Sequence, residues 1–199
     1  MIKSFLNRKF RKKFIDQNLE KDPNYNEPFV YFPIHVDMER PLLIMAPLFT
    51  NQIEIIRQVA KSLPMGLKLY VKETPAAVTR DWRPISTYKE IMSIPNVTLI
   101  HPSVSAEKLM QNSSIVFTIA GTSGFEAAFY GKPSIVFSDV GYMELPSVSR
   151  VSEIEKLESI IKKSIKTKVN HVDLDKFVNY LESNIINFNW FEMESMIKE

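Results

Sequence analysis

The sequence predicts a single α/β domain with a doubly wound, mostly parallel β-sheet of the Rossmann-like type. Short apolar runs rich in β-branched and aromatic residues alternate along the chain with segments of helical periodicity. Strands separated by single helices indicate right-handed crossovers, which produce a parallel sheet. With 199 residues, 45% of them hydrophobic and 24% charged, the chain is long enough to bury one substantial core.

Five strands and four intervening helices follow in chain order. The strands are expected over residues 27–33, 67–72, 97–100, 114–119 and 133–137, and the helices over 51–63, 87–92, 105–111 and 122–130. Pro64 and Gly66 should end the first helix, Ser105 should cap the third, and Gly131 should end the fourth. Three regions result: residues 1–27 form a basic N-terminal helix or linker, 28–152 form the Rossmann-like domain, and 153–199 form C-terminal helices packed on it.

The C-terminal region changes character. Residues 153–166 and 173–188 have helical periodicity and many charges, and Trp190 and Phe191 add bulky apolar surface near the end. We expect this aromatic pair to dock the last helix on the domain.

Charge is unevenly distributed. The net charge is +2, but six of the 25 basic residues precede the first acid, Asp16, so the rest of the chain is mildly acidic. Phe5, Phe10 and Phe14 recur among these basic residues at near-helical spacing. Residues 1–14 therefore form either an amphipathic helix for anionic lipid or a partner, or a solvated lead-in to the domain. Without a basic field on the body, we do not expect nucleic acid as a partner.

Several classes of protein are excluded by what the sequence lacks. The chain has no cysteine, hence neither a disulfide framework nor a thiolate metal site, and no apolar run long enough for a membrane span. Its start lacks the apolar core of a signal peptide. We expect a cytoplasmic protein, with residues 1–14 available for peripheral contact with the inner face of the membrane.

Three of the five glycines lie between residues 118 and 133, directly after the fourth predicted strand. In an open α/β sheet, ligands bind beyond the carboxyl ends of the strands. Gly121 would allow a sharp turn there, and Thr122, Ser123 and Gly124 would begin a helix with amides and hydroxyls suited to a phosphate. An ordinary strand-to-helix turn is the alternative, because neither the Walker pattern nor GxGxxG is present.

Glu126 follows about one turn into that helix. A carboxylate there could accept hydrogen bonds from a ribose diol, or it could be an acid on the helix surface. The two interpretations remain open on the residues alone.

Several blocks in order resemble a known family. They are FVYFPIH (29–35), LPMGLKLYVKETP (63–75), IPNVTLIHP (94–102), AEKLMQNSSIVFTIAGTSGFEAAFYGKPSIVFSDVGY (106–142) and LPSV (145–148). This set resembles the C-terminal half of capsule polysaccharide biosynthesis proteins, bacterial surface-glycan glycosyltransferases of the GT-B type that include Kdo transferases. The last long block is also similar to polysialyltransferases, teichoic-acid glycerophosphotransferases and nucleotide-sugar 2-epimerases.

The resemblance implies a domain that binds the donor, a CMP- or UDP-sugar, for transfer to a glycan or lipid-linked acceptor. It places Gly121, Thr122 and Ser123 at the phosphate and Glu126 at the ribose. Lys72, at the end of the second strand, would add a cation to the same crevice, and Gln52 matches a family position. Transfer would need neither a cofactor nor a metal, since no Asp-x-Asp motif is present.

Two departures from the family matter. Where the family often has His-Pro after the lysine-bearing strand, this sequence has Thr74-Pro75. His101, before Pro102, is a candidate for the missing imidazole, although a strand-end histidine is commonly satisfied by backbone. The chain also has room for only one of the two domains of a GT-B enzyme.

Three functions therefore stay open. The chain is a glycosyltransferase-like donor-binding domain for capsule or surface polysaccharide, a catalytically silent nucleotide-binding or regulatory module, or an epimerase-like or phosphotransferase-like enzyme. The first two would work with an acceptor-domain partner chain or as a homo-oligomer.

Overall fold

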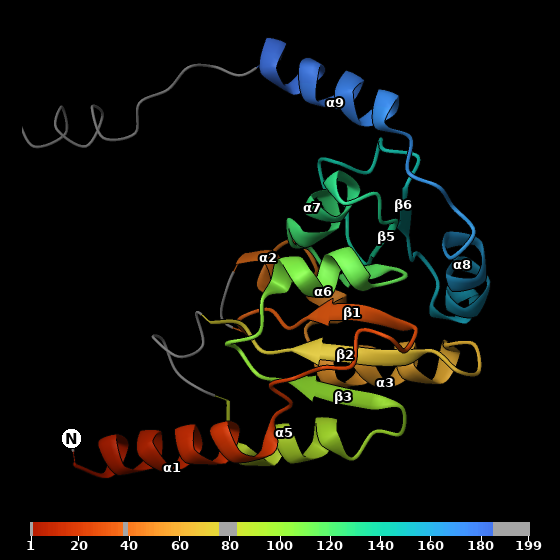
Figure 1. Ribbon diagram of the computed structural model, residues 1–199. Helices are drawn as coiled ribbons and strands as arrows, with labels where there is room; N and C mark the ends of the chain where they lie inside the picture. The colour runs from red at the N-terminus through yellow and green to blue at the C-terminus, as the bar shows by residue number, and fades with distance from the viewer. Residues whose placement is uncertain (1, 38–39, 76–82, 185–199) are drawn as a thin grey trace, which may run out of the picture.

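Six parallel strands form one sheet in the computed structural model, which describes residues 2–37, 40–75 and 83–184 (Figure 1). The strand order is β3-β2-β1-β4-β5-β6. The strands are β1 (Phe29–Pro33), β2 (Lys68–Lys72), β3 (Val97–Ile100), β4 (Val116–Thr118), β5 (Ser134–Val136) and β6 (Val148–Arg150). Every pairing is parallel, so the predicted doubly wound α/β fold is confirmed.

The helices connect these strands and cover both faces of the sheet. They are α1 (Ile2–Asn18), α2 (Arg40–Leu43), α3 (Gln52–Ser62), α5 (Ile85–Met92), α6 (Ala106–Asn112), α7 (Ser123–Phe129), α8 (Leu157–Ser164) and α9 (His171–Asn184), with short 3-10 turns η1 (Pro47–Phe49) and η2 (Ile154–Lys156). In Figure 1, α6 lies in front of the sheet and α3 behind it.

The two faces follow from the alternation of side chains along each strand. In β1, Val30 and Phe32 join the larger apolar core with α3, whereas Phe29 and Tyr31 join a second cluster with α6. All four side chains are almost completely buried. A strand covered on both faces reads as a continuous apolar run, and this is the pattern that identified β1 in the sequence.

The sheet pairing is uneven at its centre. β1 and β2 are in register over five residue pairs, and β4 and β5 over three. Between β1 and β4 the register is a single pair, Tyr31 with Val116. The strands β1–β3 and β4–β6 thus form two halves joined at a short central seam.

The predicted helix boundaries have the expected local chemistry. The side chain of Asn51 caps α3 by accepting from the Glu54 amide at 3.2 Å, and Ser105 caps α6 in the same way on Lys108. Gly66 and Gly131 have φ of 88° and 70°, the left-handed region in which glycine carries no steric cost.

Strand β6 was not expected from the sequence. It has only three residues, Val148 to Arg150, and lies at the edge of the sheet, where two of them are partly exposed and Arg150 is exposed. Three half-exposed residues give too short an alternation to distinguish a strand from a loop. The short helix α2 and the turn η1 were missed for the same reason.

The N-terminal segment packs against the main domain. Ile15 is 1% exposed, and the Phe14 ring stacks on Tyr88 of α5 with centroids 6.5 Å apart. After α1, Glu20 makes an isolated parallel bridge with Ile100 at the carboxyl end of β3.

The C-terminal helices differ in how deeply they pack. Leu157 and Ile161 of α8 are fully buried, whereas α9 buries Leu174 and places Phe177 edge-on against Phe125 at 5.7 Å. The helix expected over 173–188 is described as far as Asn184, and Trp190 and Phe191 lie outside the described residues.

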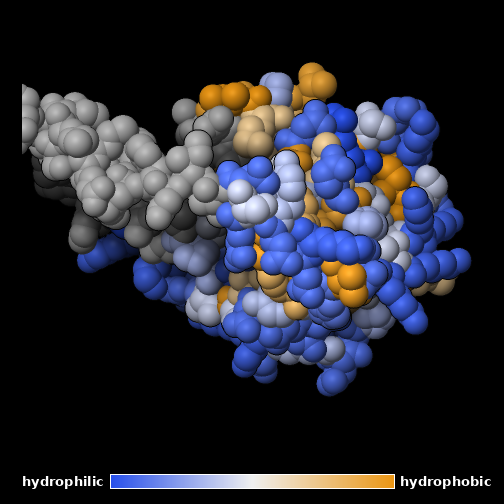
Figure 2. All heavy atoms as spheres, turned by 90° about the horizontal axis from the view of Figure 1, so that it is seen from above, coloured by the Kyte–Doolittle hydropathy of each residue, from blue (hydrophilic) through white to orange (hydrophobic). Residues whose placement is uncertain are grey.

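The surface is mostly polar. The face seen in Figure 2 is largely hydrophilic, with hydrophobic side chains in small patches. Within the described segments, no helix has both the length and the apolar character needed to cross a bilayer.

Candidate functional site: a pocket at the switch point of the sheet

The strand order creates a crevice beside β1. The chain runs from β1 outward to β3 and then returns to β4 on the other side of β1. Connections that leave in opposite directions from adjacent strands open a crevice at their carboxyl ends, where α/β proteins bind ligands. A cavity of about 270 Å³ lies there, slightly smaller than the usual range of ligand pockets.

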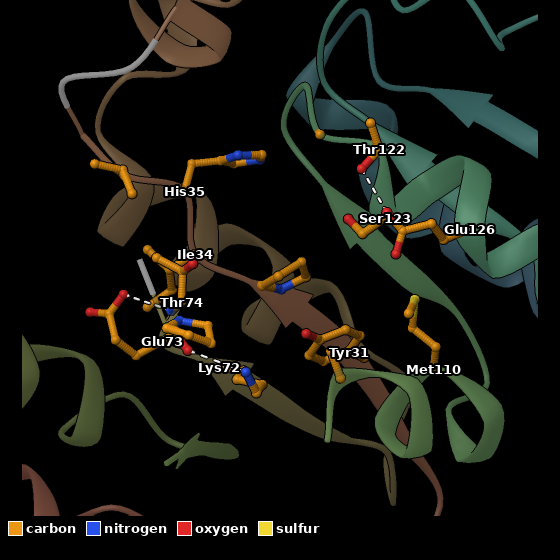
Figure 3. Close-up of a pocket in the computed structure, with 15 residues that line it drawn as sticks. Tyr31, Ile34, His35, Lys72, Glu73, Thr74, Met110, Thr122, Ser123 and Glu126 are labelled. Atoms are coloured by element: carbon orange, nitrogen blue, oxygen red, sulfur yellow. Dashed lines mark hydrogen bonds between the residues drawn. The ribbon is translucent and has the colours of Figure 1, made fainter. Parts of the chain in front are cut away.

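The pocket has two walls, with Tyr31 of β1 as the floor between them (Figure 3). One wall comes from β2 and the segment after β1, and the other from the start of α7. The lining residues are Tyr31, Pro33, Ile34, His35, Val36, Lys72, Glu73, Thr74, Pro75, Ala106, Met110, Gly121, Thr122, Ser123 and Glu126.

Lys72 is the cation of the first wall. It is 3% exposed, and its Nζ donates to the carbonyl oxygen of Glu73 at 3.4 Å. Burial lowers the pKa of Lys72, and the negative charge of Glu73 opposes that shift. The Glu73 carboxylate does not form an ion pair with Lys72, because another cation already holds it.

That other cation is Arg83. Glu73 is fully buried, and Arg83 Nη1 reaches both of its carboxylate oxygens at 2.6 Å. The Tyr88 hydroxyl donates to the same carboxylate at 2.8 Å. A buried carboxylate needs this degree of compensation. Arg83 also donates to the carbonyl oxygen of His35 and to Asp37, so one guanidinium ties the end of β2 to the segment after β1.

His35 extends from that segment toward the second wall. Its Nε2 lies 3.0 Å from the Thr118 hydroxyl, and burial together with the nearby charge of Arg83 lowers the pKa of His35 to about 4. The imidazole is therefore neutral at pH 7. A Cβ added at Gly121 would lie 2.6 Å from the His35 ring, so the glycine makes room for the imidazole.

The backbone of Gly121 is already engaged. Its amide donates to Thr118 Oγ1 at 3.0 Å, and its carbonyl oxygen accepts from the Tyr142 hydroxyl. The sequence predicts open amides along this turn, but at Gly121 the structure shows an internal partner instead. The following residues, Thr122 and Ser123, line the pocket, and no hydrogen bond joins their amides to another described residue.

Glu126 is exposed on the second wall. Thr122 Oγ1 donates to Glu126 Oε1 at 2.6 Å, so both polar groups are held at the mouth of the pocket (Figure 3). The structure thus brings five of the residues singled out from the sequence into one pocket: Lys72, Gly121, Thr122, Ser123 and Glu126.

Three other candidates do not line the pocket. Gln52 is buried and pairs with the backbone of His35 in both directions, at 2.8 and 2.9 Å, and also donates to Asp37. Gly124 packs where a Cβ would meet the Tyr142 hydroxyl at 2.6 Å. His101 lies near α1, with Nε2 3.1 Å from Asp16 and Nδ1 2.6 Å from the Ser103 hydroxyl. Gln52 and Gly124 therefore support the walls of the pocket from behind.

Four residues of this site were not expected from the sequence: His35, Glu73, Arg83 and Thr118. His35 and Glu73 each stand just after a buried strand, at the ends of the adjacent strands β1 and β2, and this placement is the signal that could have found them. Arg83 gives no such signal, because its partners are distant in sequence.

The parallel sheet and the pocket at its switch point define a Rossmann-like α/β domain. The chain belongs to the family described as capsule polysaccharide biosynthesis protein, whose model matches residues 1–182. That match includes the N-terminal segment and most of the C-terminal helices, beyond the blocks that carried the resemblance. No curated protein matches the sequence.

Solved structures share the fold at low sequence identity. The KpsC β-Kdo 2,7 transferase of Thermosulfurimonas dismutans superposes with a TM-score of 0.52 at 13% identity, over 79% of this chain and 51% of that one. The UDP-GlcNAc 2-epimerase of Methanocaldococcus jannaschii gives 0.53 at 15% identity, over 87% and 49%. The S. aureus MnaA–UDP co-structure gives 0.50 at 14% identity, over 84% and 51%. The chain thus spans about half the length of these proteins.

Proposed function

We propose that this chain is a donor-binding domain of glycosyltransferase type, which holds a CMP- or UDP-sugar for capsule or surface polysaccharide synthesis. The observation that carries the proposal is Lys72, a buried cation that lines the switch-point pocket and forms no ion pair with a carboxylate of the described residues. A buried charge is costly unless an opposite charge meets it. An anionic ligand in the pocket would supply that charge.

The charges of the pocket favour a phosphate at Lys72. The Glu73 carboxylate is neutralised by Arg83, so it does not repel an anion beside it. A phosphate in contact with the Lys72 ammonium would favour its charged form and offset the lowering of its pKa by burial. The hydroxyls of Thr122 and Ser123 on the opposite wall offer further donors.

Glu126 suits the sugar of the nucleotide. Only one of its carboxylate oxygens accepts from Thr122, which leaves the other for the hydroxyls of a ribose. The names of two structural neighbours agree with this ligand class: one is a UDP-GlcNAc 2-epimerase and another was solved with UDP.

In the transfer that we propose, an acceptor hydroxyl attacks the anomeric carbon, the bond from that carbon to the phosphate oxygen breaks, and the nucleotide leaves. Lys72 would stabilise the negative charge on the departing phosphate. The acceptor proton would pass to a base on a second body, a partner domain or chain, at the open side of the pocket. We place this chemistry in the cytoplasm, the location expected from the sequence.

A catalytically silent nucleotide-binding module is the second candidate. It is favoured by Thr74, which lines the pocket at the position where the family often has an imidazole. Release of sugar or transfer product from a labelled nucleotide sugar by the isolated chain would eliminate the silent module. Conversion of the sugar without its release would indicate an epimerase.

Calorimetric titration with CMP, UDP and their sugar conjugates tests the binding proposal. We expect one of these ligands to bind and Lys72→Met to weaken it by roughly 10- to 100-fold, because a charge-assisted hydrogen bond contributes about 1.5–3 kcal/mol. Glu126→Gln tests the ribose contact in the same titration. Lys132→Met, at the turn after α7 and outside the pocket, is the control. Absence of binding by every ligand at millimolar concentration would refute the proposal.

A further inference from the structure

Helix α1 has one face on the domain and one face away from it. Phe14 and Ile15 face inward, where Phe14 stacks on Tyr88 and Ile15 is 1% exposed. Lys9 and Lys13 are one helical turn apart on the outward side, and Phe10 beside them is 63% exposed. We call Lys9, Phe10 and Lys13 the α1 surface.

The segment around this surface is rich in basic residues. Five of the six residues from Arg8 to Lys13 are basic, and the first acid in the chain is Asp16, which pairs with Lys12 at 2.5 Å. The exposed apolar ring of Phe10 stands among these cations. The pocket does not use any of these residues, so the proposed donor site leaves them unexplained.

An anionic lipid surface fits both features. Basic side chains are attracted to the negative headgroups of such a surface, and an aromatic ring between them can enter the boundary between headgroups and acyl chains. We propose that the α1 surface docks this protein on a bilayer that contains anionic lipid.

The position of α1 determines where a docked bilayer would lie relative to the pocket. In Figure 1 the N-terminal end of α1 and the arrowheads of β1, β2 and β3 lie toward the same side of the molecule. The pocket lies at those carboxyl ends. A bilayer on the α1 surface would lie along the β3 edge of the sheet, and a lipid-linked acceptor anchored there would have to extend past β2 to enter the pocket beside β1. This last step rests on the proposed function, whereas the docking itself does not.

Co-sedimentation of the full chain with vesicles tests the docking. We expect binding to vesicles of phosphatidylcholine with phosphatidylglycerol, no binding to pure phosphatidylcholine, and a loss of binding as salt is raised. Each lysine near an anionic surface strengthens binding about fivefold, so the double variant Lys9→Gln/Lys13→Gln should bind on the order of 30-fold more weakly. Phe10→Ser should weaken binding without changing its dependence on salt.

Matched changes elsewhere serve as controls. Lys163→Gln/Lys166→Gln removes two exposed lysines, one in α8 and one just after it, and Tyr180→Ser removes an exposed ring on α9. Equal losses in the α1 and α8 double variants would overturn the proposal, as would equal binding to both kinds of vesicle. Retention on heparin without sedimentation with vesicles would also overturn it, in favour of another acidic partner. The assay contains no nucleotide, so its outcome is independent of the donor-site titration.

Discussion

His35 links the two walls of the pocket through contacts of a single residue. Gln52 and Arg83 fix its backbone, and its ring lies against Thr118 and Gly121. The imidazole is held neutral because burial and the charge of Arg83 both oppose protonation. Its protonation would disturb the region between the walls, so the stability of the fold is coupled to this one ring.

The pKa of about 4 for His35 predicts a loss of stability in acid. The unfolded chain binds a proton near the ordinary histidine pKa of 6.5, whereas the folded protein does not until about 4. The contribution of His35 is complete above 6.5 and is lost as the pH falls toward 4. Between pH 7 and pH 5 the loss should be about 2 kcal/mol.

Urea unfolding at both pH values measures this loss. His35→Gln should remove that part of the pH dependence, whereas His171→Gln, at an exposed position on α9, should retain it. An unchanged pH dependence in His35→Gln would contradict the assignment.

At the scale of elements, Arg83 connects three segments around a buried charge. It binds Glu73 after β2, the carbonyl oxygen of His35 after β1, and through Glu73 it meets Tyr88 of α5. Removing one partner of a buried ion pair leaves the other charge without compensation, which costs far more than loss of a surface pair. The strength of this connection therefore depends on its burial.

Arg83→Met should lower the free energy of unfolding by about 3–5 kcal/mol. The matched change is Arg57→Met, because Arg57 forms a surface pair with Glu90 at 3.1 Å and is 34% exposed. That change should cost no more than about 1 kcal/mol. Chemical denaturation of both variants at pH 7 compares them, and similar costs would show that the buried pair has no special role.

The elements also show what the sequence could and could not predict. Strands β1 to β5 and the helices α3, α5, α6 and α7 follow from apolar runs, capping residues and glycines whose effects are local, such as Ser105 and Gly131. β6 does not, because a three-residue edge strand is defined by its neighbour β5. An element could be predicted from the sequence wherever its own residues provide the apolar run, the cap or the glycine that defines it.

The residues of the site could likewise be predicted only where their signal is local in the sequence. Lys72, Thr122, Ser123 and Glu126 stand at strand and helix ends, and the structure brings them into one pocket. The role of Gly121 differs from the expected one, because its close neighbour is His35, 86 positions away in the chain. The Arg83 contacts likewise join residues that only the fold brings together.

At the scale of the whole molecule, the pocket spans the junction of the two halves of the sheet. Lys72 belongs to the half formed by β1–β3, and Thr122 and Ser123 belong to the half formed by β4–β6. The amides of Tyr31 and Ser114 cross the seam, to Ile115 and Phe29, at 2.9 and 2.8 Å. A ligand that contacts both walls would add a second connection between the halves.

Amide hydrogen exchange would detect that connection from a distance. In the free protein the Tyr31 and Ser114 amides should exchange faster than the Leu69 amide, which lies within the longer β2–β3 pairing. Saturation with the bound nucleotide should slow the first two more than the third. Equal slowing of all three would mean that the ligand stabilises the domain uniformly. The short central pairing thus makes the backbone itself a reporter of occupancy, without any label on the ligand.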